Sequence, residues 1–128
     1  MEIVTKLCEA DKPNSRGVTY PKNVLDSIVA NFKPGLGEAD YPVGLEVSLD
    51  RVSHEVIDLY IENGCLMAKI KVLDTPMGKI LKTLVNETNN GISFGMVGTG
   101  TPVELNVRPD DFELAQIHSI LKPANPHE

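Results

Sequence analysis

Several classes of function are disfavoured by what this sequence lacks. The chain carries 12 Lys and Arg against 18 Asp and Glu, a net charge of −6, and its basic residues form no cluster. We therefore expect no sequence-independent binding to nucleic acid, which needs grouped positive charge. No apolar run approaches the roughly 20 residues that a membrane-spanning helix needs. Residues 1–13 lack the basic and apolar segments of a signal peptide, so we expect synthesis in the cytoplasm and no membrane contact.

Cysteine is also scarce. Cys8 and Cys65 are the two cysteines, with no Cys-x-x-Cys pair and no histidine at the spacing of a metal ligand set. We expect two free thiols in the core rather than a disulfide, and no metal or other cofactor. The glycines between residues 91 and 100 precede no helix, which excludes a phosphate-binding loop.

The remaining composition is that of an ordinary soluble domain. The chain has 128 residues, 41% hydrophobic and 23% charged, which is enough to form one core over residues 1–128. Apolar side chains follow a helical period in residues 21–33, where Pro21 suits the first turn. A second stripe follows Thr75, the expected N-cap, and Pro76, which fits the first helical position. We expect two helices, with Met77, Ile80, Leu81, Leu84 and Val85 as the buried stripe of the second.

Strand signals fill most of the remaining chain. Asn-Gly at 63–64, between two alternating segments, is a strong hairpin signal. The segment 35–50 is rich in Gly and Pro and predicts a long irregular connection. We expect an α+β fold, a mostly antiparallel sheet or barrel of about six to seven strands with two packed helices. The predicted strands are 2–10, 51–61, 65–74, 91–100, 103–107 and 112–121.

Six segments, taken in order, resemble one protein family. The segments are NSRGVTYPKNVLDSIVANF, GEADYP, LDRVSHEV, VLDTPMGKILKTL, GISFGMVG and DDFELAQIHSILKPANP. Each is a weak signal alone, but together they run in order from about Asn14 to Pro126. They are similar to motifs of the prohead maturation proteases of tailed phages, whose fold is shared by the herpesvirus assemblins. The resemblance implies that fold and, in the family, serine proteolysis.

The resemblance also implies where the catalytic residues should stand. Ser93 occupies the position of the family's nucleophile, whereas Tyr41 occupies the position of its histidine base. A phenol has a usual pKa near ~10 and holds its proton at neutral pH, so it cannot easily accept another. Phe94-Gly95-Met96 replaces the family's Ser-Arg-Gly, which argues against a polar cleft beside Ser93. We therefore expect an inactive protease homologue in which Ser93 is a vestigial nucleophile.

Other histidines provide an alternative active set. His54 or His118 could act as the base for Ser93, and His118 stands where the family has an acidic residue. We favour a structural or surface role for both. His127 lies in a proline-containing tail and is expected to be solvated or at an interface. The acidic group Asp110, Asp111 and Glu113 is more typical of a turn after proline than of a metal site.

A protease fold without a base needs another function. We favour a phage head decoration or cement protein, made in the host cytoplasm and carried on the capsid surface of the virion. It would bind the major capsid protein, aided by extended ends suited to adding a strand to a partner and by self-association on the lattice. The alternatives are an active prohead serine protease that processes scaffold or capsid proteins, and an internal head-assembly scaffold factor.

Overall fold

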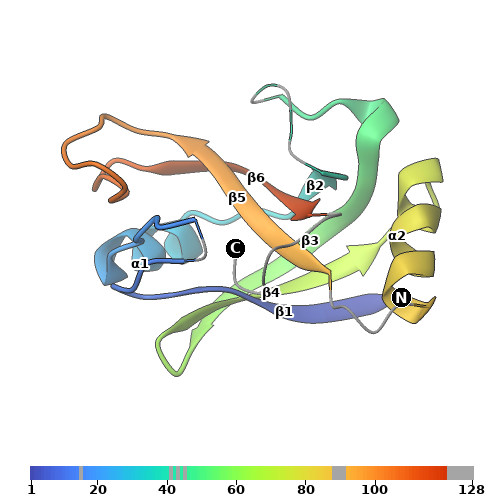
Figure 1. The fold of residues 1–128 in the computed structure, drawn as a ribbon, viewed down its shortest axis with the longest axis horizontal. Coiled ribbons are helices and arrows are strands. Elements are labelled where there is room, and N and C mark those ends of the chain that lie inside the picture. Colours follow the sequence, from blue (N-terminus) through green and yellow to red (C-terminus); the bar gives the residue numbers. More distant parts are fainter. Residues whose placement is uncertain (15, 41, 43, 45, 88–91, 121–128) are drawn as a thin grey trace.

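The chain folds as an α+β structure, as the sequence predicts. The computed structural model describes residues 1–14, 16–40, 42, 44, 46–87 and 92–120. Over these residues it has six strands and two α-helices (Figure 1). The strands are β1 Glu2–Glu9, β2 Gly35–Glu38, β3 Val52–Glu62, β4 Cys65–Val72, β5 Ser93–Thr99 and β6 Glu113–Ile120; the helices are α1 Lys22–Ala30 and α2 Pro76–Glu87, and a short 3-10 turn, η1, spans Leu49–Arg51.

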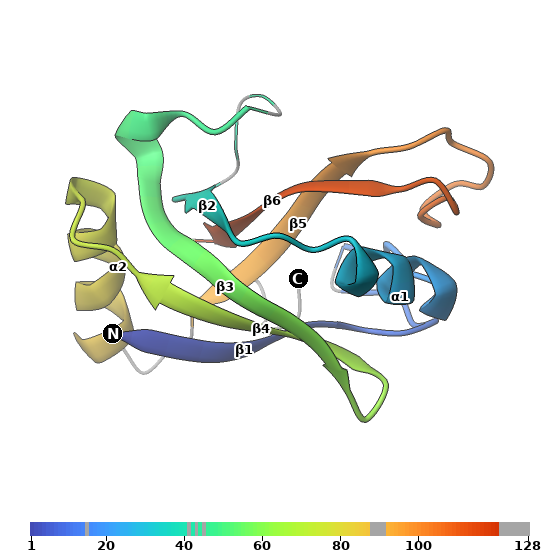
Figure 2. The ribbon, with the colours of Figure 1, turned by 180° about the vertical axis from the view of Figure 1, so that it is seen from behind.

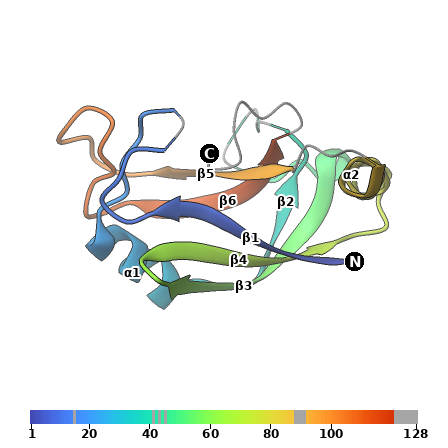
Figure 3. The same cartoon turned by 60° about the horizontal axis from the view of Figure 1, so that its bottom comes forward.

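The described strands form two antiparallel sheets. One has the order β1-β4-β3-β2, and the other pairs β5 with β6. The sheets face each other, so that β6 lies against β2 and β5 lies near β1 (Figure 3). The result is a barrel with two seams where neighbouring strands share no ladder. Helix α1 covers one end of it, and α2 packs beside β3 at the other (Figure 2).

The core lies between the two sheets and under α1. Every second residue of β4 is buried, from Leu66 through Ala68 and Ile70 to Val72, as the alternation predicts. On α1 the stripe Val24, Leu25 and Ile28 is buried, and Phe32 packs against the same cluster. Burying an aliphatic or aromatic side chain contributes about 1.5–3 kcal/mol, so this cluster is the main source of stability.

Local signals place the turns and helix starts where the sequence predicts them. Asn63 and Gly64 both have positive φ, 53° and 77°, which is the backbone of a tight hairpin turn between β3 and β4. Thr75 caps α2, because its Oγ1 accepts a hydrogen bond of 3.0 Å from the Gly78 N–H. Gly78 is pressed against the backbone of Leu73, where a Cβ would collide with a carbonyl oxygen. Among the described residues no helix is long and apolar enough to cross a membrane.

Three sequence predictions need correction. Residues 35–38 form strand β2 rather than a loop, because Gly37 can approach the Ile117 carbonyl and the His54 ring only without a Cβ. Residues 103–107 form no strand: Asn106 has φ 60° and turns the chain back within the long connection between β5 and β6. Ile80 is exposed, so the buried face of α2 is centred on Gly78 and Leu81 instead.

Candidate functional site

Ser93 begins strand β5 and is only 1% exposed. Its cross-strand partner on β6 is Ile120, and two residues further along β5 Gly95 pairs with His118. Because cross-strand partners and every second residue share one face of a sheet, the side chains of Ser93 and His118 are diagonal neighbours on that face. Such diagonal neighbours lie roughly 7–8 Å apart, with their Cβ atoms somewhat closer. The structure therefore places Ser93 and His118 on the same face of the β5–β6 pair.

His118 lies with its ring over Gly95. A Cβ built on Gly95 would be 3.0 Å from His118 Nε2. The other ring nitrogen, Nδ1, is 3.1 Å from the Ser119 carbonyl oxygen. A carbonyl can only accept, so a neutral ring here carries its proton on Nδ1 and its lone pair on Nε2. The basic nitrogen of His118 is thus directed toward β5, the strand that carries Ser93.

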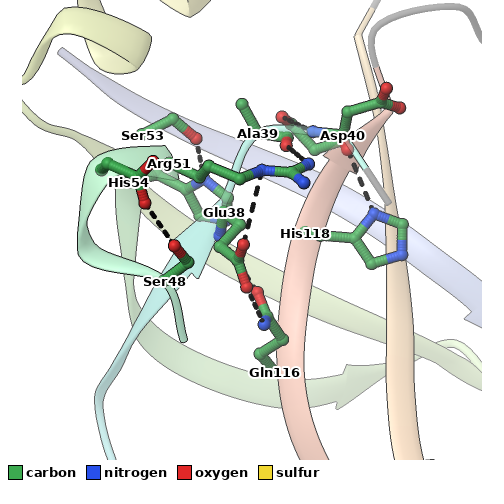
Figure 4. Close-up of polar contacts among 11 residues, drawn as sticks. Glu38, Ala39, Asp40, Ser48, Arg51, Ser53, His54, Gln116 and His118 are labelled. Atoms are coloured by element: carbon green, nitrogen blue, oxygen red, sulfur yellow. Dashed lines mark hydrogen bonds and ion pairs between the residues drawn. The ribbon is translucent and has the colours of Figure 1, made fainter. Parts of the chain in front are cut away.

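His54 is held on the other side of β5. Its ring packs edge-on against Phe94, with the ring centres 5.1 Å apart, and Phe94 points to the face opposite Ser93. His54 Nε2 donates to the Ile117 carbonyl at 2.8 Å. Its Nδ1 accepts from the Ser53 hydroxyl at 2.7 Å (Figure 4). Burial lowers the pKa of His54 to about 4; the Ile117 hydrogen bond opposes this shift and the nearby His118 adds to it. His54 is therefore a neutral structural link between β3 and β6.

Ser53 is a residue that the sequence did not single out. A chain of hydrogen bonds runs from Ser53 through His54 to the Ile117 carbonyl. It resembles the arrangement of a nucleophile, a base and an acceptor that orients the base. Both side chains are fully buried, however, so no substrate can reach the hydroxyl. The sequence does show serine next to histidine at this point, which could have suggested the hydrogen bond. Sequence alone cannot distinguish a buried pair from an accessible one.

The sequence also gave no sign of a buried polar cluster where β2 meets β6. Glu38 is buried, and its Oε2 accepts a hydrogen bond of 2.7 Å from Gln116 Nε2. Gln116 Oε1 in turn accepts from the Glu38 N–H at 3.0 Å, so the two residues are joined reciprocally. Arg51 Nε lies 3.5 Å from Glu38 Oε1 and supplies the opposite charge (Figure 4). These contacts offset the free-energy cost of removing the Glu38 carboxylate from water.

The cluster fixes the chain that leads to position 41. The Ala39 N–H donates to the Arg51 carbonyl at 2.9 Å, and Arg51 Nη2 donates to the Ala39 carbonyl at 2.6 Å. The Asp40 N–H then donates to Ser119 Oγ at 3.4 Å, one residue from His118. Tyr41 itself lies outside the described residues. The residue before it is nonetheless anchored on the strand that carries His118.

The two apolar residues after Ser93 do not pack beside its side chain. Phe94 and Met96 are both buried in the hydrophobic core, on the face of β5 that Ser93 does not share. Their apolar character therefore reflects the packing of the barrel. The absence of the family's arginine at this position remains a feature of the sequence, but it does not by itself block the space near Ser93.

The remaining candidates have structural roles or lie outside the described residues. Asp110 accepts from Asn23 Nδ2 at 2.8 Å, and Asp111 accepts from the Thr101 hydroxyl at 2.7 Å, consistent with a turn. Over the described part of the chain, no group of three or more His, Cys, Asp or Glu side chains could hold a metal. Both cysteines are free thiols, one buried and one half-buried. His127 lies outside the described residues.

Comparison with known proteins supports the fold. No protein-family model matches the sequence, and no curated protein is similar to it in sequence. Among solved structures, the chain is similar to the capsid assembly protease gp21 of bacteriophage T4, with a TM-score of 0.72 and 16% sequence identity. The similarity covers 94% of this chain and 81% of that one. At this identity the likeness shows the fold alone: the chain has a prohead-protease-like fold, as the sequence motifs predict.

Proposed function

We propose that this chain is a phage head protein that keeps the protease fold without proteolysis and acts as a decoration or cement protein on the major capsid protein. The likeness to a capsid assembly protease supports a role in the phage head. The expected location is the capsid surface of the virion. No cofactor is needed for such a role, because binding to a repeated lattice gains its strength from many equivalent contacts.

The low exposure of Ser93, only 1%, is the main support for a loss of proteolysis. In addition, position 41, where the family has its histidine base, is a tyrosine. A serine attacks a peptide bond only when a base removes its proton and the substrate carbonyl can approach its Oγ. A phenol does not remove the serine proton at neutral pH, and burial keeps the substrate carbonyl away from Ser93 Oγ. Loss of the base in a serine protease lowers kcat by about 10⁴- to 10⁶-fold.

A second candidate function is an active serine protease that uses Ser93 with His118 as its base. The observation that favours it is their shared face on the β5–β6 sheet, with the His118 Nε2 lone pair directed toward β5. Such an enzyme would need Ser93 to become accessible. A fluorophosphonate probe tests this directly, since an activated serine reacts with it and a buried one does not. Labelling of the purified chain that disappears in both Ser93→Ala and His118→Ala would establish the protease.

The decoration role is tested on particles. Mature heads, purified and run on a gel with band identification, should contain this chain at a copy number that matches the capsid lattice. Electron microscopy of the same heads should place it on the outer surface. A chain that is present in proheads and missing from mature heads would instead identify an internal scaffold factor, and the decoration role would be wrong.

A further inference from the structure

At the α1 end of the molecule, a groove is bordered by the edge of strand β6. Its volume is about 520 Å³, and it lies between α1, the start of β2 at Gly35 and Leu36, and the whole of residues 110–117. Alternate side chains of a strand point to opposite faces, so one face alone would contribute only every second residue. A run of consecutive lining residues therefore means that the backbone edge of β6 itself faces the groove.

That edge of β6 is unpaired in the described part of the chain. Strand β6 pairs only with β5, and β2 pairs only with β3. The two strands touch at Gly37, where an added Cβ would collide with the Ile117 carbonyl, and the groove lies between Gly35 and the start of β6. An unpaired edge presents a row of N–H and C=O groups that another extended segment can join. Residues 113–116 are the part of β6 that offers such an edge to the groove.

The groove is acidic. Asp110, Asp111 and Glu113 line it and are exposed, and Lys33 is the single cation among its described lining residues. The hydrogen bonds that Asp110 and Asp111 accept come from neutral groups, which do not cancel their charge. No ion pair joins any of the three carboxylates to a cation in the part of the chain that the structure describes. The groove is therefore complementary to a cationic ligand.

The end of α1 adds to this preference for positive charge. Asn31 lines the groove and is the C-cap of the helix. The C-terminus of a helix carries a partial negative charge, and the last turn of α1 has no basic residue to balance it. The groove also has apolar lining, so its ligand should carry apolar groups beside its charge. The apolar side chains that line it include Ile28, Phe32, Leu36, Val56, Leu114 and Ile117.

We propose that the free edge of β6 at residues 113–116 takes up an extended, basic segment of another protein as an added strand. Backbone hydrogen bonds to β6 hold the segment, its Lys or Arg side chains lie toward the three carboxylates, and its apolar side chains enter the groove. A second copy of this chain is a poor occupant, because its net charge is −6 and its basic residues form no cluster.

The groove is separate from the candidate catalytic residues. Ser93 pairs with Ile120 at one end of the β5–β6 ladder, whereas Glu113 pairs with Thr99 at the other. The proposal is also independent of the decoration role, since the isolated chain would bind such a segment in solution, with or without proteolysis.

Selection from a display library of random linear octapeptides, on the immobilised full chain, tests the chemistry of the segment. We expect the enriched sequences to carry several Lys or Arg residues, with apolar residues at alternating positions. Their binding should weaken as NaCl is raised from about 0.05 M to about 0.5 M, because salt screens exposed charges. Enrichment of uncharged or acidic sequences, or of none, would overturn the proposal.

Variants of the groove test where the selected peptide binds. Glu113→Lys should raise the Kd of the peptide by about ten-fold, because an attractive charge becomes a repulsive one. Leu36→Ser removes an apolar lining side chain and should raise the Kd by about three- to ten-fold. Glu87→Lys is the matched control: it makes the same change in net charge at an exposed position of α2, at the other end of the molecule (Figure 2), and should leave the Kd within about two-fold. Equal effects of Glu113→Lys and Glu87→Lys would refute binding at the groove.

Methylation of the peptide backbone tests the addition of a strand. N-methyl groups at alternate residues remove every second N–H donor. One alternating set should be tolerated, and the other should weaken binding at least about ten-fold, because a strand directs only every second residue's N–H toward β6. Equal tolerance of both sets would exclude an added strand. Self-association of the chain that Glu113→Lys abolishes would identify a second copy as the occupant and would also overturn the proposal.

Discussion

Gly95 on β5 and His118 on β6 are cross-strand partners, and the His118 ring lies close to where a side chain on Gly95 would begin. A Cβ on Gly95 would lie 3.0 Å from His118 Nε2 and 3.4 Å from Ile120 Cδ1. The glycine therefore gives the ring its place over β5, and the ring covers the strand next to Ser93. Replacing the glycine should therefore shift the His118 ring while leaving the sequence at Ser93 and His118 unchanged.

Gly95→Ala should destabilise the fold by about 1–3 kcal/mol, because an added methyl group forces the His118 ring to shift inside a packed interior. Urea denaturation would measure the change. Gly44→Ala is the control, since a Cβ at Gly44 meets no atom within 4 Å, and it should alter the free energy of unfolding by less than about 0.5 kcal/mol. Equal stability of the two variants would mean that the His118 ring can move aside for the added methyl group at no cost, contrary to the packing around it.

Acid should weaken the fold through His54. Its pKa is lowered by burial from 6.5 to about 4 in the folded chain, so the unfolded chain binds a proton more tightly. The free energy of unfolding should therefore fall as the pH drops from about 6.5 to about 4, by about 3 kcal/mol in total. Urea denaturation at several pH values measures this slope. His54→Gln, which cannot titrate, should lose most of it; an unchanged slope would assign the acid sensitivity to other groups.

Gln116 should stabilise the junction of β2 and β6 mainly through Glu38. Gln116→Ala removes the 2.7 Å hydrogen bond to a buried carboxylate and should cost about 2–3 kcal/mol. A double-mutant cycle with Glu38→Ala should give a coupling energy between about 0.5 and 3 kcal/mol, measured by chemical denaturation. Additive effects of the two substitutions would show that the residues stabilise the fold separately.

The two thiols should differ in reactivity. Burial is the main cause that raises the pKa of Cys8 to about 12, so this thiol stays protonated and shielded at neutral pH. Cys65 is half-buried at the end of the β3–β4 hairpin. Iodoacetamide on the native chain, followed by mass spectrometry, should modify Cys65 and leave Cys8 unmodified until denaturant is added. Early modification of Cys8 would indicate local opening of β1.

Restoring the family's base should not restore proteolysis. In Tyr41→His an imidazole returns to the expected position, but Ser93 would still be 1% exposed, as in the present structure. We expect no fluorophosphonate labelling of this variant above that of Tyr41→His/Ser93→Ala. Labelling that depends on Ser93 would show that tyrosine at position 41 is the sole obstacle, and that the serine is accessible after all.

The elements with strong local signals could be predicted from the sequence. The helix stripe at Val24, Leu25 and Ile28, the cap at Thr75 and the Asn63-Gly64 turn each depend on neighbouring residues, and all are present. The strand β3 shows the limit. Its register shifts between Val56 and Asp58, so Val56 and Leu59 both reach the core although strict alternation places them on opposite faces. A bulge of this kind leaves no local signal.

The candidate site was harder to predict because its contacts are distant in sequence. Ser93 and His118 were chosen from motif positions, but their shared face follows from the register of β5 with β6. Glu38 and Gln116 are 78 positions apart, and neither has a local pattern that indicates burial. Residues 103–107 show the opposite error: their alternation resembles a strand, yet within the described part of the chain they make only isolated bridges and join no sheet.

The seam between β2 and β6 has a consequence for how the molecule opens. The two sheets meet there through the Glu38–Gln116 pair and the His54–Ile117 hydrogen bond, where a continuous ladder would have joined them along their whole length. A seam held by a few such bonds is weaker than a ladder, so local opening of β5 and β6 should begin there, although the core packed between the two sheets opposes their full separation. Amide protons of β5 and β6 should then exchange with solvent first. Ser93, buried in the closed barrel, lies on β5, one of the two strands expected to exchange first.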